Sequence, residues 1–186
     1  MQKKKLIVII IALVLVLAGG ASLYNLLGSG NVPETSVVDE QGNAEETESV
    51  RAPDFTVYDQ DGSSLTLADL EGKPAVINFW ASWCGPCKSE MADFNEKYLE
   101  LGDEVRFVMI NLTDGSRETQ QTAMEFVNSE GYQFPVYFDL EMSASNSYQA
   151  YSIPMTFFID RDGNAVAQAT GAIDAATLQK GIDMIK

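Results

Sequence analysis

The chain has 186 residues, of which 46% are hydrophobic and 10% aromatic, an ordinary composition that leaves room for one globular domain with short appendages. Its formal charge is −15 at pH 7, with 12 lysines and arginines against 27 aspartates and glutamates. This acidity argues against a nucleic-acid-binding protein, because such proteins present clustered Lys and Arg side chains to the phosphates.

The first 27 residues are predicted to form a membrane anchor or a signal peptide. Three lysines at positions 3–5 precede the wholly apolar residues 6–18, and the next charged residue is Glu34. If the apolar stretch continues to Leu27 it is long enough to span a bilayer, and the preceding lysines are expected to stay cytoplasmic. Small residues at 18–21 also fit a signal-peptide cleavage site, so that alternative stays open. We therefore expect either a single-pass cell-membrane protein with an extracytoplasmic domain, or a secreted domain if the segment is cleaved.

Residues 28–50 are predicted to form an acidic, disordered linker. They contain six carboxylates among scattered apolar residues, namely Glu34, Asp39, Glu40, Glu45, Glu46 and Glu48. Such a segment buries too little apolar surface to offset the entropy of ordering it. The pattern becomes globular at Arg51, and the folded domain is predicted to span residues 51–186.

The first half of this domain predicts a hairpin, a strand and a helix. Residues 55–58 and 65–67 flank an Asp-Gly turn dipeptide, which favours a hairpin. The apolar residues 75–80 predict a buried central strand. The helix after them carries an apolar stripe at helical spacing, formed by Met91, Phe94, Tyr98 and Leu101.

The second half continues this alternation. It predicts strands at residues 105–112 and 134–138, helices at 116–130 and 143–151, and a hairpin of strands 156–159 and 165–169. Gly131 fits a helix C-terminus, and Asp174 is predicted to cap a last helix. Strands that alternate with helices predict an α/β fold, with a central mixed sheet flanked by helices.

Both cysteines lie in the run Trp83-Cys84-Gly85-Pro86-Cys87, directly after the predicted central strand. A helix that starts at Cys84 leaves this side chain beside unpaired backbone N–H groups, whose partial positive charge favours thiolate. Cys87 lies one helical turn further on, within reach of a mixed disulfide formed on Cys84. Pro86 fits the first helical turn, which needs no N–H from it. The pair is predicted to be a catalytic redox couple in which Cys84 attacks and Cys87 resolves.

Two other interpretations of the cysteine pair are weaker. A zinc site needs four ligands, and a chain without histidine or a third cysteine supplies them only through dimerisation or carboxylates. We therefore expect no metal and no other cofactor. A purely structural disulfide across so short a loop removes little chain entropy.

The order of these motifs resembles the thioredoxin fold and, within it, the TlpA/ResA-like family of membrane-anchored, extracytoplasmic thiol-disulfide oxidoreductases. The resemblance is carried by Ala52-Pro53-Asp54-Phe55, Leu65-Thr66-Leu67, residues 76–87, residues 153–160 and Asp162-Gly163. It covers the chain from about Pro53 to the C-terminus. It implies a thioredoxin-like fold with an N-terminal hairpin and a central insertion at residues 112–142.

The resemblance also implies a substrate groove beside the cysteines. Ile153-Pro154 matches the position of the family's cis-proline, and the backbone of Ile153 would then be free to pair with an extended substrate. Trp83 is expected to line this groove together with Gly85 and Pro86, whereas Trp80 is expected to pack inside the domain.

One departure from cytoplasmic thioredoxins concerns proton transfer. Asn78 stands where those proteins carry a buried aspartate, and an asparagine cannot accept the proton of the second cysteine. Proton transfer to and from Cys87 must then use water or another carboxylate, and Glu90 is the candidate by proximity in the sequence. The Gly85-Pro86 pair is the one found in reducing thioredoxins and favours a reductase.

The function expected from this resemblance is the reduction of protein disulfides outside the cytoplasm. Because the exterior lacks the cytosolic thiol-reducing systems, a membrane thiol-electron donor is the implied partner. Two alternatives stay open. One is an oxidase that donates disulfides to exported proteins, since no residue pattern determines a reduction potential. The other is a non-enzymatic binding or metal-carrier module on a thioredoxin scaffold.

Overall fold

A computed structural model of the chain describes residues 36–37 and 50–186. The expected anchor and most of the expected linker lie outside the described residues. In the described part of the chain, no helix has the length and apolar character needed to cross a membrane. The short strand β1 (Ser36–Val37) falls inside the expected linker and pairs in parallel with β9 (Asn164–Thr170). Edge pairing of this kind uses backbone groups, so an acidic composition neither predicts nor prevents it.

The strands form one mixed sheet, as the sequence predicts. The remaining strands are β2 (Val50–Arg51), β3 (Thr56–Tyr58), β4 (Ser64–Thr66), β5 (Ala75–Trp80), β6 (Arg106–Asn111), β7 (Val136–Phe138) and β8 (Met155–Ile159). Their order is β1-β9-β8-β5-β6-β7-β3-β4, and β2 also pairs with β9. Neighbours β5, β6 and β7 are parallel, whereas β8 and β9 and the β3–β4 hairpin are antiparallel.

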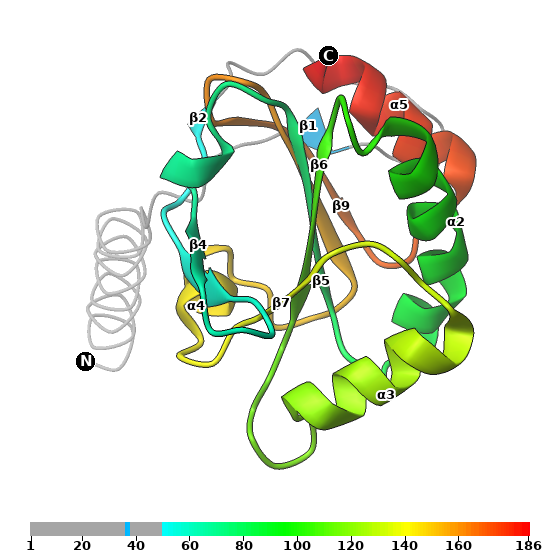
Figure 1. Cartoon of the computed structure of the whole chain (residues 1–186). Helices are drawn as coiled ribbons and strands as arrows, with labels where there is room; N and C mark the ends of the chain where they lie inside the picture. Colours follow the sequence, from blue (N-terminus) through cyan, green and yellow to red (C-terminus); the bar gives the residue numbers. More distant parts are fainter. Residues whose placement is uncertain (1–35, 38–49) are drawn as a thin grey trace, which may run out of the picture. The chain divides into compact units, whose positions relative to one another are not determined.

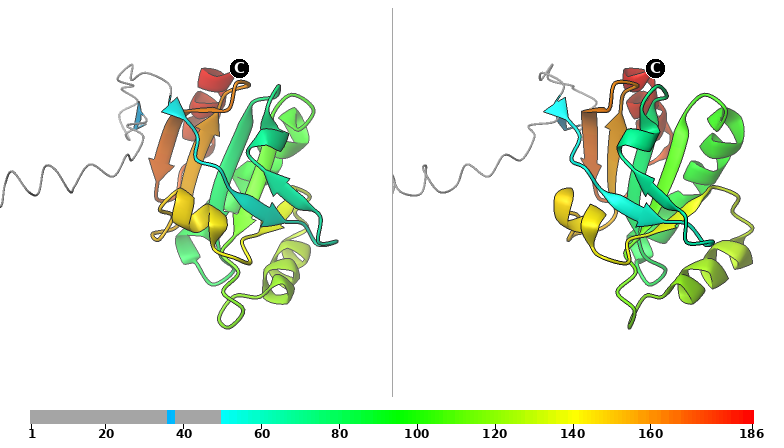
Figure 2. Two further views of the ribbon diagram at one scale, coloured as in Figure 1. Left: turned by 90° about the vertical axis from the view of Figure 1, so that its left-hand side faces the viewer. Right: turned by 60° about the vertical axis from the view of Figure 1, so that its left-hand side comes forward.

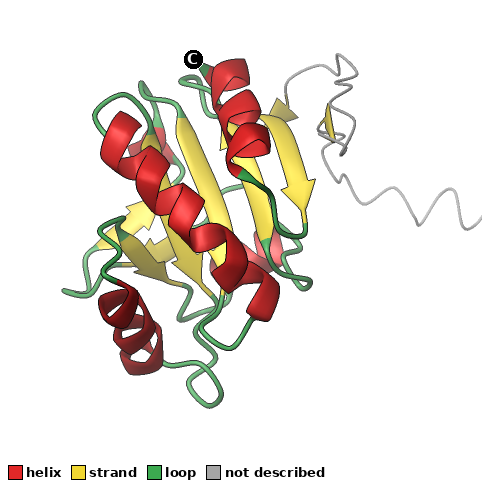
Figure 3. Ribbon diagram, turned by 90° about the vertical axis from the view of Figure 1, so that its right-hand side faces the viewer, coloured by secondary structure: helices red, strands yellow, loops and turns green. Residues whose placement is uncertain are grey.

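Helices cover both faces of this sheet. They are the 3-10 helix η1 (Ala68–Leu70), α2 (Gly85–Leu101), α3 (Gln120–Glu130), α4 (Ser143–Ser147) and α5 (Ala175–Ile185). Figures 1 and 3 show α2, α3 and α5 on one side of the central strands. Figure 2 shows the other side, where α4 and the β3–β4 hairpin lie in front of them. The insertion expected at residues 112–142 contains α3 and β7.

The central strand β5 is buried along its whole length, because both of its faces pack against a hydrophobic core. Val76 and Trp80 point to the core under α2, α3 and α5, whereas Ile77 and Phe79 point to the core under α4 and the hairpin. This alternation follows from the two-residue period of a strand. The predicted helical stripe is confirmed: Met91 and Phe94 are fully buried, and Tyr98 and Leu101 pack against the same core.

The helix predicted at residues 116–130 begins four residues later than expected, at Gln120. The Asp114 side chain accepts hydrogen bonds from three successive backbone N–H groups, which closes a turn instead of a helical start. Thr119 then caps α3, and Gly131 ends it at φ 73°, as predicted. The helix predicted at residues 143–151 is also shorter than expected, since α4 ends at Ser147.

The C-terminal elements match their predictions and pack closely together. β8 and β9 form the predicted hairpin, and Asp174 caps α5 by accepting the N–H of Thr177 at 2.8 Å. Gly181 of α5 faces Phe158 of β8. A Cβ atom at Gly181 would lie 2.2 Å from the Phe158 ring, so glycine allows a close approach of α5 to the sheet that a larger residue would prevent.

Candidate active site

The two cysteines lie where β5 leads into α2, and they form a disulfide with a Cα–Cα distance of 5.3 Å. Cys84 is the N-cap of α2, and its sulfur accepts the N–H of Cys87 at 3.2 Å. Cys84 is 5% exposed and Cys87 is completely buried. The predicted helix start and the greater exposure of Cys84 are both confirmed. Of the two cysteines, Cys84 is therefore the one closer to the surface.

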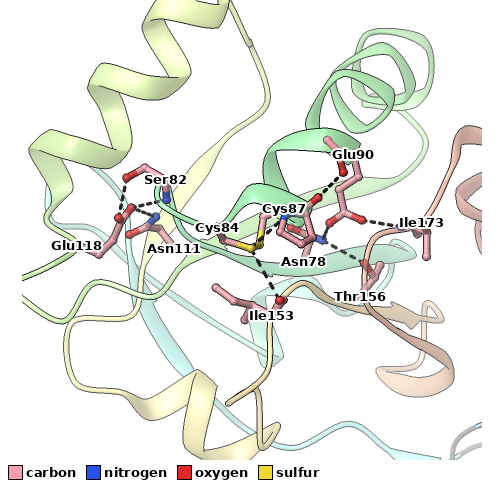
Figure 4. Close-up of a disulfide and its surroundings, with 12 residues drawn as sticks. Asn78, Ser82, Cys84, Cys87, Glu90, Asn111, Glu118, Ile153, Thr156 and Ile173 are labelled. Carbon is pink, nitrogen blue, oxygen red and sulfur yellow. Dashed lines mark hydrogen bonds between the residues drawn. A yellow bond between two sulfur atoms is a disulfide. The ribbon is translucent and has the colours of Figure 1, made fainter.

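The segment Ile153-Pro154 lies against the cysteines, although 69 residues separate it from Cys84. The Ile153-Pro154 peptide bond is cis, as the family resemblance implies. The Ile153 carbonyl oxygen is 3.8 Å from Cys84 Sγ (Figure 4). In the described part of the chain, Ile153 forms no backbone–backbone hydrogen bond, so its main-chain groups are available to a bound segment.

A buried carboxylate lies on the same helix as Cys87, one turn further on. Glu90 accepts a hydrogen bond from Asn78 Nδ2 at 2.9 Å and another from the backbone N–H of Ile173 at 2.8 Å (Figure 4). Burial raises the pKa of Glu90 to about 7, although both hydrogen bonds act to lower it. A carboxyl group with this pKa exchanges a proton at neutral pH, which is the property that a proton relay needs.

Asn78 meets Glu90 because it lies on the α2 side of β5, in alternation with Val76 and Trp80. Its Nδ2 atom also donates to Thr156 Oγ1 at 3.1 Å. Within the described residues its Oδ1 atom is a buried acceptor without a hydrogen-bond partner. The pair therefore combines a carboxyl group that titrates near neutrality with a neutral amide, where two carboxylates would repel each other.

Of the residues expected to line a substrate groove, Trp83, Gly85 and Pro86 are exposed, whereas Ile153 is half-buried and Pro154 is buried. Trp83 is 42% exposed beside Cys84, and Gly85 and Pro86 are exposed at the start of α2. Trp80 is fully buried, as expected. A Cβ atom at Gly85 would meet nothing within 4 Å, so the surface next to Cys84 is open. The exposed face of the site is thus formed by the residues on either side of Cys84.

Two residues that contact this region, Arg117 and Glu118, were not among the residues predicted from the sequence. Glu118 is fully buried and accepts hydrogen bonds from Ser82, and Arg117 lies over the ring of Trp83. They belong to the loop before α3, at least 30 residues from either cysteine. No local pattern marks them, because the contact exists only after β5 and β6 have paired.

In residues 36–37 and 50–186, no group of three or more Cys, Asp or Glu side chains is placed to hold a metal ion. The two sulfurs are bonded to each other instead. The chemistry that these residues support is thiol–disulfide exchange.

Comparisons with known proteins agree with this site. Residues 49–168 match the AhpC/TSA family. The thiol-disulfide oxidoreductase ResA of Bacillus subtilis is 30% identical over 177 residues, which cover 95% of this chain and 90% of that protein. The ResA protein of Bacillus thuringiensis is 38% identical over 123 residues, 64% of this chain and 68% of the relative.

Among solved structures, StoA from Bacillus subtilis superimposes with a TM-score of 0.61 at 26% identity, covering 72% of this chain and 98% of StoA. The thioredoxin-like fold implied by the sequence is therefore confirmed. The chain belongs to the AhpC/TSA family, and it is a thiol-disulfide oxidoreductase of the ResA type whose cysteine pair is Cys84 and Cys87.

Proposed function

We propose that this enzyme reduces protein disulfides outside the cytoplasm, with Cys84 as the nucleophile and Cys87 as the resolving thiol. The observation that carries this proposal is the position of Cys84 at the N-terminus of α2, where it is 5% exposed while Cys87 is completely buried. A helix N-terminus stabilises a thiolate, and only a reachable thiolate can attack a protein disulfide.

The reaction then runs in two exchanges. The Cys84 thiolate attacks one sulfur of the substrate disulfide, forms a mixed disulfide and expels the other substrate sulfur as a thiolate that takes up a proton. Cys87 then loses its proton, attacks Cys84 Sγ and releases the second substrate thiol. The substrate gains two electrons and two protons, and the enzyme is left with the Cys84–Cys87 disulfide.

Glu90 is the group that we propose as the acceptor of the Cys87 proton. It lies three residues after Cys87 on α2, so both side chains lie on one face of the helix. Its pKa of about 7 lets it take up a proton at neutral pH and release it again. Asn78 keeps this carboxyl group in place through the hydrogen bond to Oε1.

The substrate is proposed to be an extended protein segment that lies across Trp83, Gly85, Pro86 and Ile153-Pro154. Ile153 lies beside Cys84 and forms no backbone–backbone hydrogen bond within the described residues. This supports the proposal, since its main chain can form strand-like hydrogen bonds with a bound chain.

Membrane attachment through residues 1–27 and an extracytoplasmic location are proposed from the lysines at positions 3–5 and the apolar run that follows. A thiol reductase in that location must receive electrons across the membrane, from a membrane thiol-electron donor. Protease treatment of intact cells tests the orientation. We expect residues 51–186 to be digested from outside, and full protection would contradict the proposal.

The direction of electron flow is tested by the reduction potential of the Cys84–Cys87 pair, measured by equilibration of the full chain with glutathione buffers. We expect a value below about −200 mV, because the Gly-Pro pair is that of reducing thioredoxins. A value near about −120 mV, typical of a strong oxidant, would support a disulfide-donating oxidase instead.

A further inference from the structure

The segment that leads into Cys84 is held by the loop at residues 113–119. Glu118, at the end of this loop, is fully buried. Its Oε1 atom accepts the backbone N–H of Ser82 at 2.9 Å and Asn111 Nδ2 at 2.7 Å, and its Oε2 atom accepts the Ser82 hydroxyl at 2.7 Å (Figure 4). One carboxylate thus joins the end of β6 to the residue two positions before the nucleophile.

The loop is shaped by its own hydrogen bonds. Asp114 Oδ1 accepts the backbone N–H groups of Ser116, Arg117 and Glu118 at 2.7, 2.8 and 3.0 Å. Gly115, at φ 74°, also donates its N–H to the Glu118 carbonyl at 3.0 Å. Glu118 is therefore placed by the loop itself, and it can impose a position on Ser82.

The residue next to Glu118 contacts the residue next to Cys84. The guanidinium carbon of Arg117 lies 3.7 Å from the centroid of the Trp83 ring, the geometry of a cation–π contact. Two successive loop residues, Arg117 and Glu118, thus hold Trp83 and Ser82, the two residues that precede Cys84. These contacts are separate from Glu90 and Asn78, which lie on the Cys87 side.

We propose that Glu118 and Arg117 are positioning residues for the nucleophile. They hold the chain at Ser82 and Trp83 so that Cys84 stays at the N-cap of α2, where its sulfur accepts the Cys87 N–H. Glu118 acts by fixing the position of the backbone, because its carboxylate accepts the N–H of Ser82. Without this hydrogen bond the segment before Cys84 would be free to move. The proposal rests on thiol–disulfide exchange at Cys84 and is independent of the direction of electron flow.

Alkylation of Cys84 by iodoacetamide tests this proposal. It is measured from pH 5 to 9 on the reduced full chain in a Cys87→Ala background, so that a single thiol reacts. Glu118→Ala is expected to slow alkylation at pH 7 about tenfold and to move the midpoint of the pH profile upward. Glu118→Gln keeps the acceptor oxygen and is expected to react at least as fast as the parent. Arg117→Met, at an exposed position, is expected to slow the reaction about twofold.

Asp139→Ala is the matched control, because Asp139 is also buried and its carboxylate also accepts hydrogen bonds from a neighbouring segment, the backbone N–H groups of Ala144 and Ser145. It is expected to leave the profile of Cys84 unchanged. The proposal is overturned if Glu118→Gln is as slow as Glu118→Ala, if both match the parent, or if Asp139→Ala slows the reaction equally. If Glu118→Ala fails to fold, the alkylation profiles of Arg117→Met and Ser82→Ala test the proposal instead. Profiles like that of the parent for both variants would contradict it. Alkylation needs no protein substrate, so its result does not depend on the proposed reductase function. That function is tested separately, by measuring whether the parent protein reduces protein disulfides.

Discussion

The amide of Asn78 donates a hydrogen bond to Glu90 Oε1 at 2.9 Å, in an interior position where neither side chain has more than 1% of its surface exposed. One partner comes from the central strand and the other from the helix that carries the cysteines. A neutral amide at this position stabilises the carboxylate without adding a second charge. The proposed relay is therefore a single titrating group, and the ionisation of Glu90 can be followed by itself.

Glu90 makes the stability of the fold depend on pH. Its pKa is about 7 in the folded protein and about 4.5 when unfolded, so the unfolded chain releases this proton first. The contribution to stability is fullest below pH 4.5, falls as the pH rises to 7 and is constant above. The total change is about 3 kcal/mol. Glu90→Gln is expected to remove this slope and to be more stable than the parent at pH 8. Urea unfolding at pH 4.5 and 8 measures it, and equal slopes for parent and variant would contradict the assignment.

Asn78→Asp places a second carboxylate against Glu90. Two ionised groups at this distance repel each other, so either one of them stays protonated or the free energy of unfolding falls. We expect a loss of at least about 2 kcal/mol of unfolding free energy at pH 8 that is largely recovered at pH 4.5. Asn128→Asp, at an exposed position of α3, is the matched control and should change stability little. A pH-independent loss in Asn78→Asp would indicate altered packing instead of charge repulsion.

Substitution of each cysteine separates their roles. Cys87→Ala should accumulate mixed disulfides with protein substrates, because Cys84 still attacks but nothing resolves the product. Cys84→Ala should accumulate almost none, since Cys87 is completely buried. Non-reducing electrophoresis of cell extracts detects the adducts. If only Cys84→Ala accumulated adducts, and Cys87 were the thiol alkylated first at neutral pH, the two assigned roles would be reversed.

Gly181 is expected to be intolerant of any side chain. A Cβ atom there would lie 2.2 Å from the ring of Phe158, which is fully buried and cannot move away. Gly181→Ala should lower the free energy of unfolding by about 1–3 kcal/mol, despite the higher helix propensity of alanine. The double variant with Phe158→Leu should show a favourable coupling energy, because the smaller side chain leaves room for the methyl group. Thermal unfolding of the three variants measures this, and additive effects would rule out the contact.

The elements with a strong periodic pattern were predicted closely. The central strand and the stripe of Met91 and Phe94 on α2 were predicted from apolar spacing, because a buried face requires apolar residues at the period of the strand or helix. The start of α3 was not predicted. Asp114 and Thr119 move the start of α3, and a side chain that binds backbone N–H groups leaves no signal in hydrophobic periodicity.

The chemistry of the site could be predicted from the sequence alone. Two cysteines two residues apart, after a buried strand and at a helix start, predict a redox pair, because the separation of one helical turn brings the sulfurs together. The lack of histidine and of a third cysteine makes a zinc site the weaker interpretation. The sequence also singled out Glu90, but only by its nearness to Cys87.

The residues that support this chemistry are brought to the cysteines by the assembled fold. Ile153 contacts Cys84, Ile173 contacts Glu90, and Glu118 contacts Ser82, and these partners are 36 to 83 residues apart in the sequence. Asn78 also contacts Glu90, from the neighbouring strand. Such contacts depend on which strands become neighbours and on which face each residue then occupies, and these are properties of the assembled sheet. The pKa of Glu90 is the clearest case. The same carboxyl group titrates near 4.5 in water, and burial between β5 and α2 moves it to about 7.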